Sequence, residues 1–165
     1  MIEPCYLQRV VIDNANLSCT NFREAKFVEV SLKDSDFQDS CLNSANLSYA
    51  DLKGLNLRSY DLNDAVFKCA DLEKSVLDEA YLRDADFEEA KLVGSSFKNA
   101  RLQSAKIKGA NLQEADFTDA RIIEADFRSV VNLNSHQVKV ARHWESAIYD
   151  PEMQKELGLA PESDE

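Results

Sequence analysis

The residues of this chain that could hold a metal or act as nucleophiles are few and scattered. The 165 residues include two histidines and four cysteines, and the cysteines stand at Cys5, Cys19, Cys41 and Cys69. A zinc site commonly shows two pairs of ligands at short spacing, and this chain has no such pair of cysteines. His136 and His143 are seven residues apart with no cysteine near them. We therefore expect no metal, no cofactor and no disulfide, as in a cytoplasmic protein with free thiols.

The charged residues exclude several further functions. Thirty acidic residues against 19 basic ones give a net charge of −11, which disfavours direct binding to nucleic acid or to an anionic membrane surface. No apolar run approaches the roughly 20 residues of a membrane-spanning helix, and the first residues lack the features of a secretory signal. A catalytic nucleophile needs a base beside it in a cleft, and no such pair stands out. We expect a protein that is not an enzyme.

The elements that must position any functional residue are set by a repeat of five residues. A large apolar residue occurs at every fifth position from Leu7 to Phe127, through 25 consecutive repeats without an insertion or deletion. We call this the large position. Two residues before it stands an uncharged and mostly small residue, most often alanine, which we call the small position. The other three positions are mostly polar.

A period of five excludes the two common elements. On an α-helix five residues advance about 500°, so the apolar residues would form no stripe, and on a continuous strand an odd period alternates between faces. The pattern instead indicates a short extended piece followed by a corner. The small and large positions then point inward, the residue between them points to solvent, and two corner residues follow. A chain that turns the same way each time stacks in coils about 4.8 Å apart, which predicts a parallel β-solenoid.

The repeat also carries a family motif. Ala45-Asn46-Leu47, Ala70-Asp71-Leu72 and Ala85-Asp86-Phe87 follow the pattern A(D/N)(L/F)xx, and over about residues 5–130 the chain resembles the pentapeptide-repeat family. The resemblance implies an all-β fold, a right-handed quadrilateral parallel β-helix of about six coils; periodicity alone does not give the number of sides. The predicted core lies on two opposite walls and comprises Phe27, Phe37, Leu47, Leu57, Phe67, Leu77, Phe87, Phe97, Ile107, Phe117 and Phe127.

We divide the chain into a β-helix at 5–131, a short C-terminal α-helical cap at 132–160 and an acidic, disordered tail at 161–165. Asn134-Ser135 can cap a helix over about 136–149. The apolar face of this helix would carry Val140, Trp144 and Ile148. A second helix begins at Asp150-Pro151 and ends near Gly158. This segment resembles the C-terminal segments of cyanobacterial members of the family.

Several pentapeptide-repeat proteins bind type II topoisomerases by imitating a DNA duplex, which requires a face with a clear excess of acids. Only the face whose large positions run from Leu17 to Phe117 is clearly acidic, with two bases, Arg58 and Lys98. Its acids, the candidate partner-binding residues, are Asp36, Asp39, Asp78, Glu79, Asp116 and Asp119. The other faces are mixed, and the unbroken register leaves no room for the inserted loops of the quinolone-resistance members.

The preferred hypothesis is a non-enzymatic scaffold that presents flat faces to another protein. The alternative is a DNA-mimicking modulator of a type II topoisomerase such as DNA gyrase. A third possibility, a small-molecule or metal binder that uses the tail, would show as a ligand-dependent shift in melting temperature. An open coil end is an unpaired strand edge, so both a monomer and a dimer formed through such an end stay open.

Overall fold

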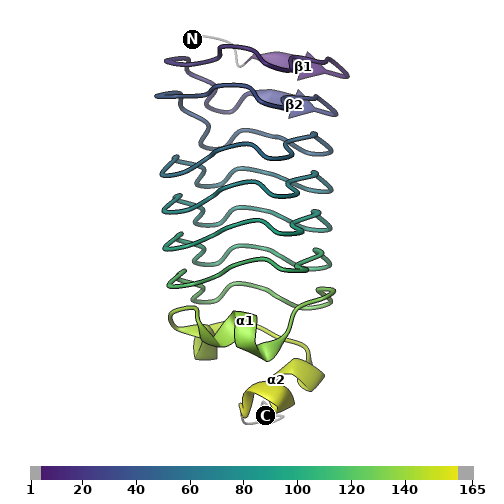
Figure 1. The fold of residues 1–165 in the computed structure, drawn as a ribbon, viewed down its shortest axis with the longest axis vertical. Helices are drawn as coiled ribbons and strands as arrows, with labels where there is room; N and C mark the ends of the chain where they lie inside the picture. Colours follow the sequence, from purple (N-terminus) through teal and green to yellow (C-terminus); the bar gives the residue numbers. More distant parts are fainter. Residues whose placement is uncertain (1–4, 160–165) are drawn as a thin grey trace.

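The computed structural model describes residues 5–159 and shows a column of stacked coils (Figure 1). Parallel bridges join residues twenty apart along the column, from Val11 with Ser31 to Asn111 with Val131. The two regular strands, β1 (Tyr6–Gln8) and β2 (Lys26–Val28), pair in the same register, with Leu7 opposite Phe27. Because a repeat of five residues returns to the same column after twenty, each coil has four sides.

Every corner of the column uses the same backbone conformation. The second corner residue has a positive φ in all 25 repeats, and only Gly54, Gly94 and Gly109 among these residues are glycines. A left-handed residue at this point is what a type II turn requires. A backbone hydrogen bond closes the turn, as where the amide of Ala25 donates to the carbonyl of Phe22 at 2.9 Å. The chain therefore turns in the same sense after each extended piece.

The core consists of rows of side chains stacked along the column, and all eleven residues named above for it are buried. The rings of Phe67 and Phe87 stack at 4.8 Å and 6°, and those of Phe97 and Phe117 at 5.1 Å and 7°. The two rows meet where Phe87 and Phe97 pack edge to face at 5.9 Å. The inside of the column is thus filled by side chains at the coil spacing, and function must lie on the outer faces.

Three short helices follow the last repeat: α1 (Ser135–Lys139), the 3-10 helix η1 (Trp144–Ser146) and α2 (Pro151–Leu157). They lie at the C-terminal end of the column (Figure 1). Asn134 caps α1 in a capping box with Gln137. The side-chain amide of Gln137 donates to the backbone carbonyls of Leu112 and Ala115, both at 2.9 Å. Helix α2 begins and ends where the sequence predicts.

The prediction of one helix over about 136–149 is wrong. After Lys139 the chain leaves the helix and continues the parallel ladder, with Arg142 beside Arg121 and Ile148 beside Asp126. This pairing satisfies peptide groups of the last coil that a helix would leave without partners. Ile148 consequently takes the outward place of a repeat.

The apolar contacts of this segment therefore differ from those predicted. Val140 and Ile148 are 37% and 39% exposed, and Trp144 is half-buried against the core. The fully buried contacts come from residues not named beforehand, Val138, Ala141, Tyr149 and Leu157. The Tyr149 ring takes an inward place and stacks on Phe127 at 5.8 Å.

Within residues 5–159 no helix is long and apolar enough to span a bilayer. The predicted disordered tail at 161–165 lies outside the described residues.

The left-handed corners predict the effect of adding a β-carbon. Gly94 has φ +64°, and the nearest atom to an added Cβ is Lys74 Cγ at an ordinary 3.6 Å. The strain of Gly94→Ala is therefore that of the backbone alone, and we expect a loss of about 1 kcal/mol in the free energy of unfolding in urea. Glu114→Ala is the matched control, because Glu114 occupies the same corner one coil further on with φ 57°. Equal losses in the two variants would contradict this account.

The buried phenol of Tyr149 predicts a dependence on alkaline pH. Burial, and to a lesser extent the charge of Glu145, raise the pKa of Tyr149, and its hydroxyl donates to the Trp144 carbonyl at 2.8 Å. The stabilisation that the buried, protonated Tyr149 phenol contributes is fully present below the unfolded pKa of about 10 and is lost as pH rises above that value. We expect the melting temperature to fall more steeply above about pH 10 in the natural protein than in Tyr149→Phe. Parallel profiles would refute the assignment.

Candidate interaction surface

We call the face whose large positions run from Leu17 to Phe117 in steps of twenty the acidic wall. The structure brings all six predicted acids to this face, in columns set by the coil period. Asp36 and Asp116 occupy the outward middle column. Asp39, Glu79 and Asp119 share the left-handed corner, and Asp78 stands beside it.

Most of these carboxylates already have partners. Glu79 forms an ion pair with Arg58, Asp116 pairs with Lys98 at 3.2 Å, and Asp119 pairs with Arg142 at 2.9 Å. The Asp78 carboxylate accepts hydrogen bonds from the Ser96 hydroxyl and from the Lys98 amide. Of the six, Asp36, Asp39 and Asp78 form no ion pair within residues 5–159. The wall is therefore not a continuous stretch of free negative charge.

Glu79 and Asp116 stay ionised because their pKa values are lowered. The hydrogen bond from Arg58 holds the pKa of Glu79 below its usual range, with smaller help from Ser59. Burial raises the pKa of Asp116, but hydrogen bonds from Thr118 and Lys98 outweigh it and leave that pKa low. Both carboxylates are charged at neutral pH, and each forms an ion pair with a base of the acidic wall.

The backbone ladder is interrupted where Asp36 and Asp39 stand. On either side it is regular, with the amide of Leu17 donating to the Asp36 carbonyl and that of Leu57 to the Val76 carbonyl, both at 2.7 Å. Between the second and third coils, no backbone hydrogen bond joins residues 34–42 to residues 53–61. The amides that lose their expected partners are those of Asp34, Phe37, Asp39, Leu42, Asn56 and Asp61. Pairing resumes where Ser44 donates to the Asn63 carbonyl at 2.8 Å.

Two large residues at small positions explain the interruption. Leu55 and Tyr60 stand where every repeat from Ala65 to Ala125 has alanine or serine. Side chains at this position point inward and stack at a spacing of about 4.8 Å, so leucine and tyrosine need more room than the ladder leaves. The Ser40 hydroxyl, one coil below Tyr60, is buried without a hydrogen-bond partner. Both residues are readable in the sequence, but the interruption of the ladder was not predicted from them.

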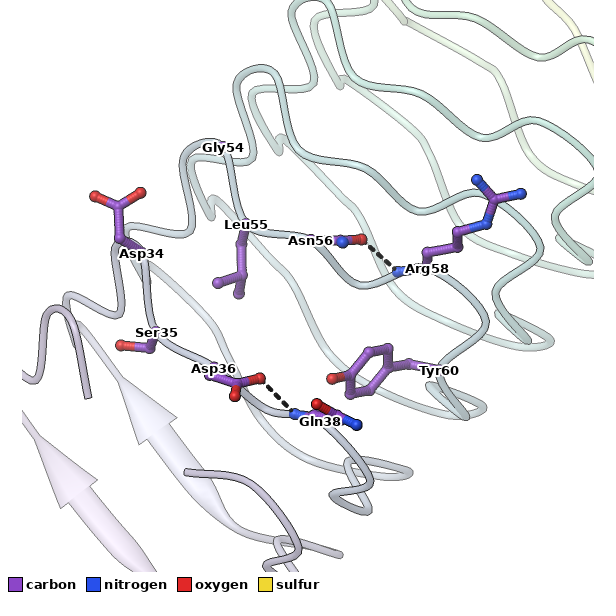
Figure 2. A pocket seen from close by; sticks show the side chains of 9 residues that line it. All are labelled: Asp34, Ser35, Asp36, Gln38, Gly54, Leu55, Asn56, Arg58 and Tyr60. Atoms are coloured by element: carbon purple, nitrogen blue, oxygen red, sulfur yellow. Dashed lines mark hydrogen bonds between the residues drawn. The ribbon is translucent and has the colours of Figure 1, made fainter. Parts of the chain in front are cut away.

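The separated coils leave two adjoining depressions in the surface. The larger has a volume of about 600 Å³ and is lined by Asp34, Ser35, Asp36, Gln38, Gly54, Leu55, Asn56, Arg58 and Tyr60 (Figure 2). The smaller, of about 290 Å³, extends past Asp39, Ser40 and Asp61. Figure 2 shows the Tyr60 ring directed from the third coil towards Gln38 of the second. Burial raises the pKa of Tyr60, and the carboxylates of Asp36 and Asp39 add to this.

This site offers backbone donors and acceptors without ladder partners, the carboxylates of Asp36 and Asp39 without ion pairs, and the Tyr60 ring. Across residues 5–159, no three His, Cys, Asp or Glu side chains come together as a metal site. All four cysteines are free, and Cys5, Cys19 and Cys41 are exposed.

Stacked four-sided coils, a filled core and left-handed corners together define a four-sided β-solenoid. The family model for pentapeptide repeats matches in eight copies, at residues 5–43, 40–78, 80–119 and 95–131. The chain belongs to the pentapeptide repeat family, whose members fold as right-handed quadrilateral β-helices.

Solved structures of similar shape come from the same family. Full-length QnrB1, a plasmid-mediated fluoroquinolone resistance protein, is 13% identical with a TM-score of 0.54, and the match covers 93% of this chain and 90% of QnrB1. Rfr23 from the cyanobacterium Cyanothece 51142 is 19% identical (TM-score 0.48; 88% and 91% covered).

HetL, involved in heterocyst differentiation regulation in the cyanobacterium Nostoc sp. strain PCC 7120, is 22% identical (TM-score 0.35). The match covers 74% of this chain but only 62% of HetL. None of the proteins of curated function matches this sequence. At these identities the likeness to QnrB1 shows a shared fold and nothing of function.

The interrupted ladder predicts fast exchange of particular amides. In hydrogen exchange, we expect the six amides named above to lose protection while those of Leu57 and Ser59, which donate to the next coil, keep it. Leu55→Ala/Tyr60→Ala restores small residues and lets the coils close, so we expect the six amides to exchange at least about tenfold more slowly in this variant.

Leu77→Ala is the control, because it truncates a buried residue at a large position, away from the interruption. It should lower stability by about 2–5 kcal/mol without protecting the six amides. Full protection of these amides in the natural protein, or none gained in the double variant, would show that Leu55 and Tyr60 do not hold the coils apart.

Proposed function

We propose that this protein is a non-enzymatic scaffold that binds another protein on the acidic wall, at the interrupted ladder between residues 34–42 and 53–61. The observation that carries the proposal is the loss of ladder hydrogen bonds in front of a solvent-accessible depression. Free backbone groups at a sheet edge are a common means by which a protein binds an extended segment of another.

The side chains around the opening suggest what that segment would be. Asp36 and Asp39 are exposed and lack ion pairs, whereas Glu79, Asp116 and Asp119 further along the wall are neutralised by ion pairs and Asp78 accepts two hydrogen bonds. Tyr60 supplies an aromatic contact at the centre, of the kind enriched at binding hot spots. We therefore take the partner to be a protein with an extended, basic segment. Membership of a family of interaction proteins supports this class of function.

The proposal includes a cytoplasmic location. The four free cysteines are its support, because scattered unpaired thiols are typical of reducing compartments.

A DNA-mimicking modulator of a type II topoisomerase is the second candidate. It is favoured by the likeness in fold to QnrB1 over nearly the whole of both chains. The internal ion pairs of Glu79, Asp116 and Asp119 count against it, because a duplex mimic needs a row of uncompensated negative charge.

Affinity capture from a native lysate of the source organism would test the proposal with four baits. They are the natural protein, Leu55→Ala/Tyr60→Ala, the core control Leu77→Ala, and the charge variant Asp36→Lys/Asp78→Lys/Asp116→Lys. We expect one protein to be retained by the natural protein and by Leu77→Ala, and to be lost from the variant with closed coils. Its binding must then be reproduced with the purified partner.

The other outcomes decide between the candidates. Capture of DNA gyrase that the charge variant loses and the closed-coil variant keeps, together with inhibition of supercoiling by the natural protein, would replace the scaffold by the DNA mimic. A partner retained equally by all four baits would remove the acidic wall from the proposal. Recovery of no protein would overturn constitutive binding at this site.

A further inference from the structure

The face that follows the acidic wall along the chain carries a column of positive charge. Its outward middle residues in the later coils are Tyr81, Arg101, Arg121 and Arg142, each bridged in parallel to the next. All four side chains are exposed. We call Arg101, Arg121 and Arg142 the arginine column.

Folding does not explain this column. Like charges directly opposite one another on neighbouring strands are destabilising, and elsewhere on the outward positions opposite charges alternate or like charges are compensated. Lys106, for example, stands between Asp86 and Asp126.

Where two acids do adjoin, at Asp51 and Asp71, lysines neutralise both. Lys33 pairs with Asp51 at 2.9 Å, and Lys53 pairs with Asp71 at 3.1 Å. The arginine column has no such compensation over most of its length.

Two residues of the arginine column have no counter-charge. Arg142 pairs with Asp119 at 2.9 Å, but Arg101 and Arg121 form no ion pair with any residue in 5–159. The Arg101 guanidinium lies over the Tyr81 ring at 4.5 Å from its centre. This contact orients the guanidinium and leaves its donors for a ligand. In a chain of net charge −11, two adjacent arginines without counter-charges mark a site for an external anion.

We propose that the arginine column binds an acidic segment of a partner protein, laid along the axis of the column. A guanidinium presents a planar fork of donors that matches a carboxylate in two parallel hydrogen bonds. Rows of the column are about 4.8 Å apart, and alternate side chains of an extended segment are about 6.6 Å apart. The long arginine side chains bridge that difference.

Charge favours an acidic peptide over nucleic acid. A DNA duplex carries one negative charge for every 1.7 Å or so of its axis and is broader than one column of residues. It would also meet Asp84 and Glu124, the acids at the corner of the same face, both exposed. A single acidic segment can contact the column and avoid these corners. The site is independent of the interrupted ladder, since it lies in later coils and on other residues.

The test is fluorescence anisotropy with labelled decaglutamate, and decaglutamine as the uncharged control. We expect the natural protein to bind decaglutamate alone, and Arg101→Gln/Arg121→Gln to weaken that binding about tenfold or more, since each exposed ion pair contributes up to about fivefold. Arg23→Gln is the matched control, because Arg23 lies on the same face of the solenoid but in the first coil, far from the arginine column. It pairs with Glu24 at 3.5 Å. This variant should bind as the natural protein does.

Three results would overturn the proposal. They are no binding of decaglutamate by the natural protein, equal binding by all three proteins, or tighter binding of a 20-base-pair duplex that Arg101→Gln/Arg121→Gln abolishes. The last result would assign the column to nucleic acid. The variants alter exposed side chains only, and retention of the natural melting temperature shows that any loss of binding is local.

Discussion

Successive coils reach hydrogen-bonding distance when the side chains at the small positions leave them enough room. The ladder depends on this constraint, because each five-residue repeat has few backbone partners outside the coils above and below it. Where alanine or serine fills the position, from residue 65 onward, the ladder runs regularly as far as the last full coil. Where Leu55 and Tyr60 fill it, the peptide groups of two coils part and a depression opens. A packing rule of the interior therefore determines a feature of the surface.

The faces of the column are alike in backbone and differ in chemistry. Because residues twenty apart share a column, a few substitutions at one position of the repeat are enough to make a stripe of one charge. On the acidic wall half of the acids are neutralised by ion pairs, as where Lys98 reaches Asp116. On the next face Arg101 and Arg121 are left without counter-charges. A count of charges by face does not separate these two cases, since the difference lies in which side chains reach each other.

The period of five was sufficient to predict the solenoid, the inward rows and the turns at the corners, because each follows from where side chains must point. The number of sides came only from the resemblance, since a coil of three sides would place the large residues inward equally well. The prediction for the C-terminal segment was wrong in part. Val140, Trp144 and Ile148 have helical spacing, but the last coil offers peptide groups without partners. The segment pairs with these groups instead of forming a longer helix. The interrupted ladder was readable in principle at Leu55 and Tyr60. It was not predicted, because the five-residue pattern gives the direction of a side chain but not whether the neighbouring coils leave room for its volume.

The interrupted ladder also bears on how the column responds to force and to denaturant. In a solenoid each coil is held by its neighbours, so stability spreads along the axis through nearest-neighbour coupling. Between the second and third coils this coupling rests on the remaining sides, through hydrogen bonds such as that from Leu32 to the Asp51 carbonyl at 3.0 Å. Residues 5–44 are thus joined to the rest of the column by a weaker seam. A pull on the two ends would separate the column there first, and the coils beyond would remain a folded template on which the first two could wind again.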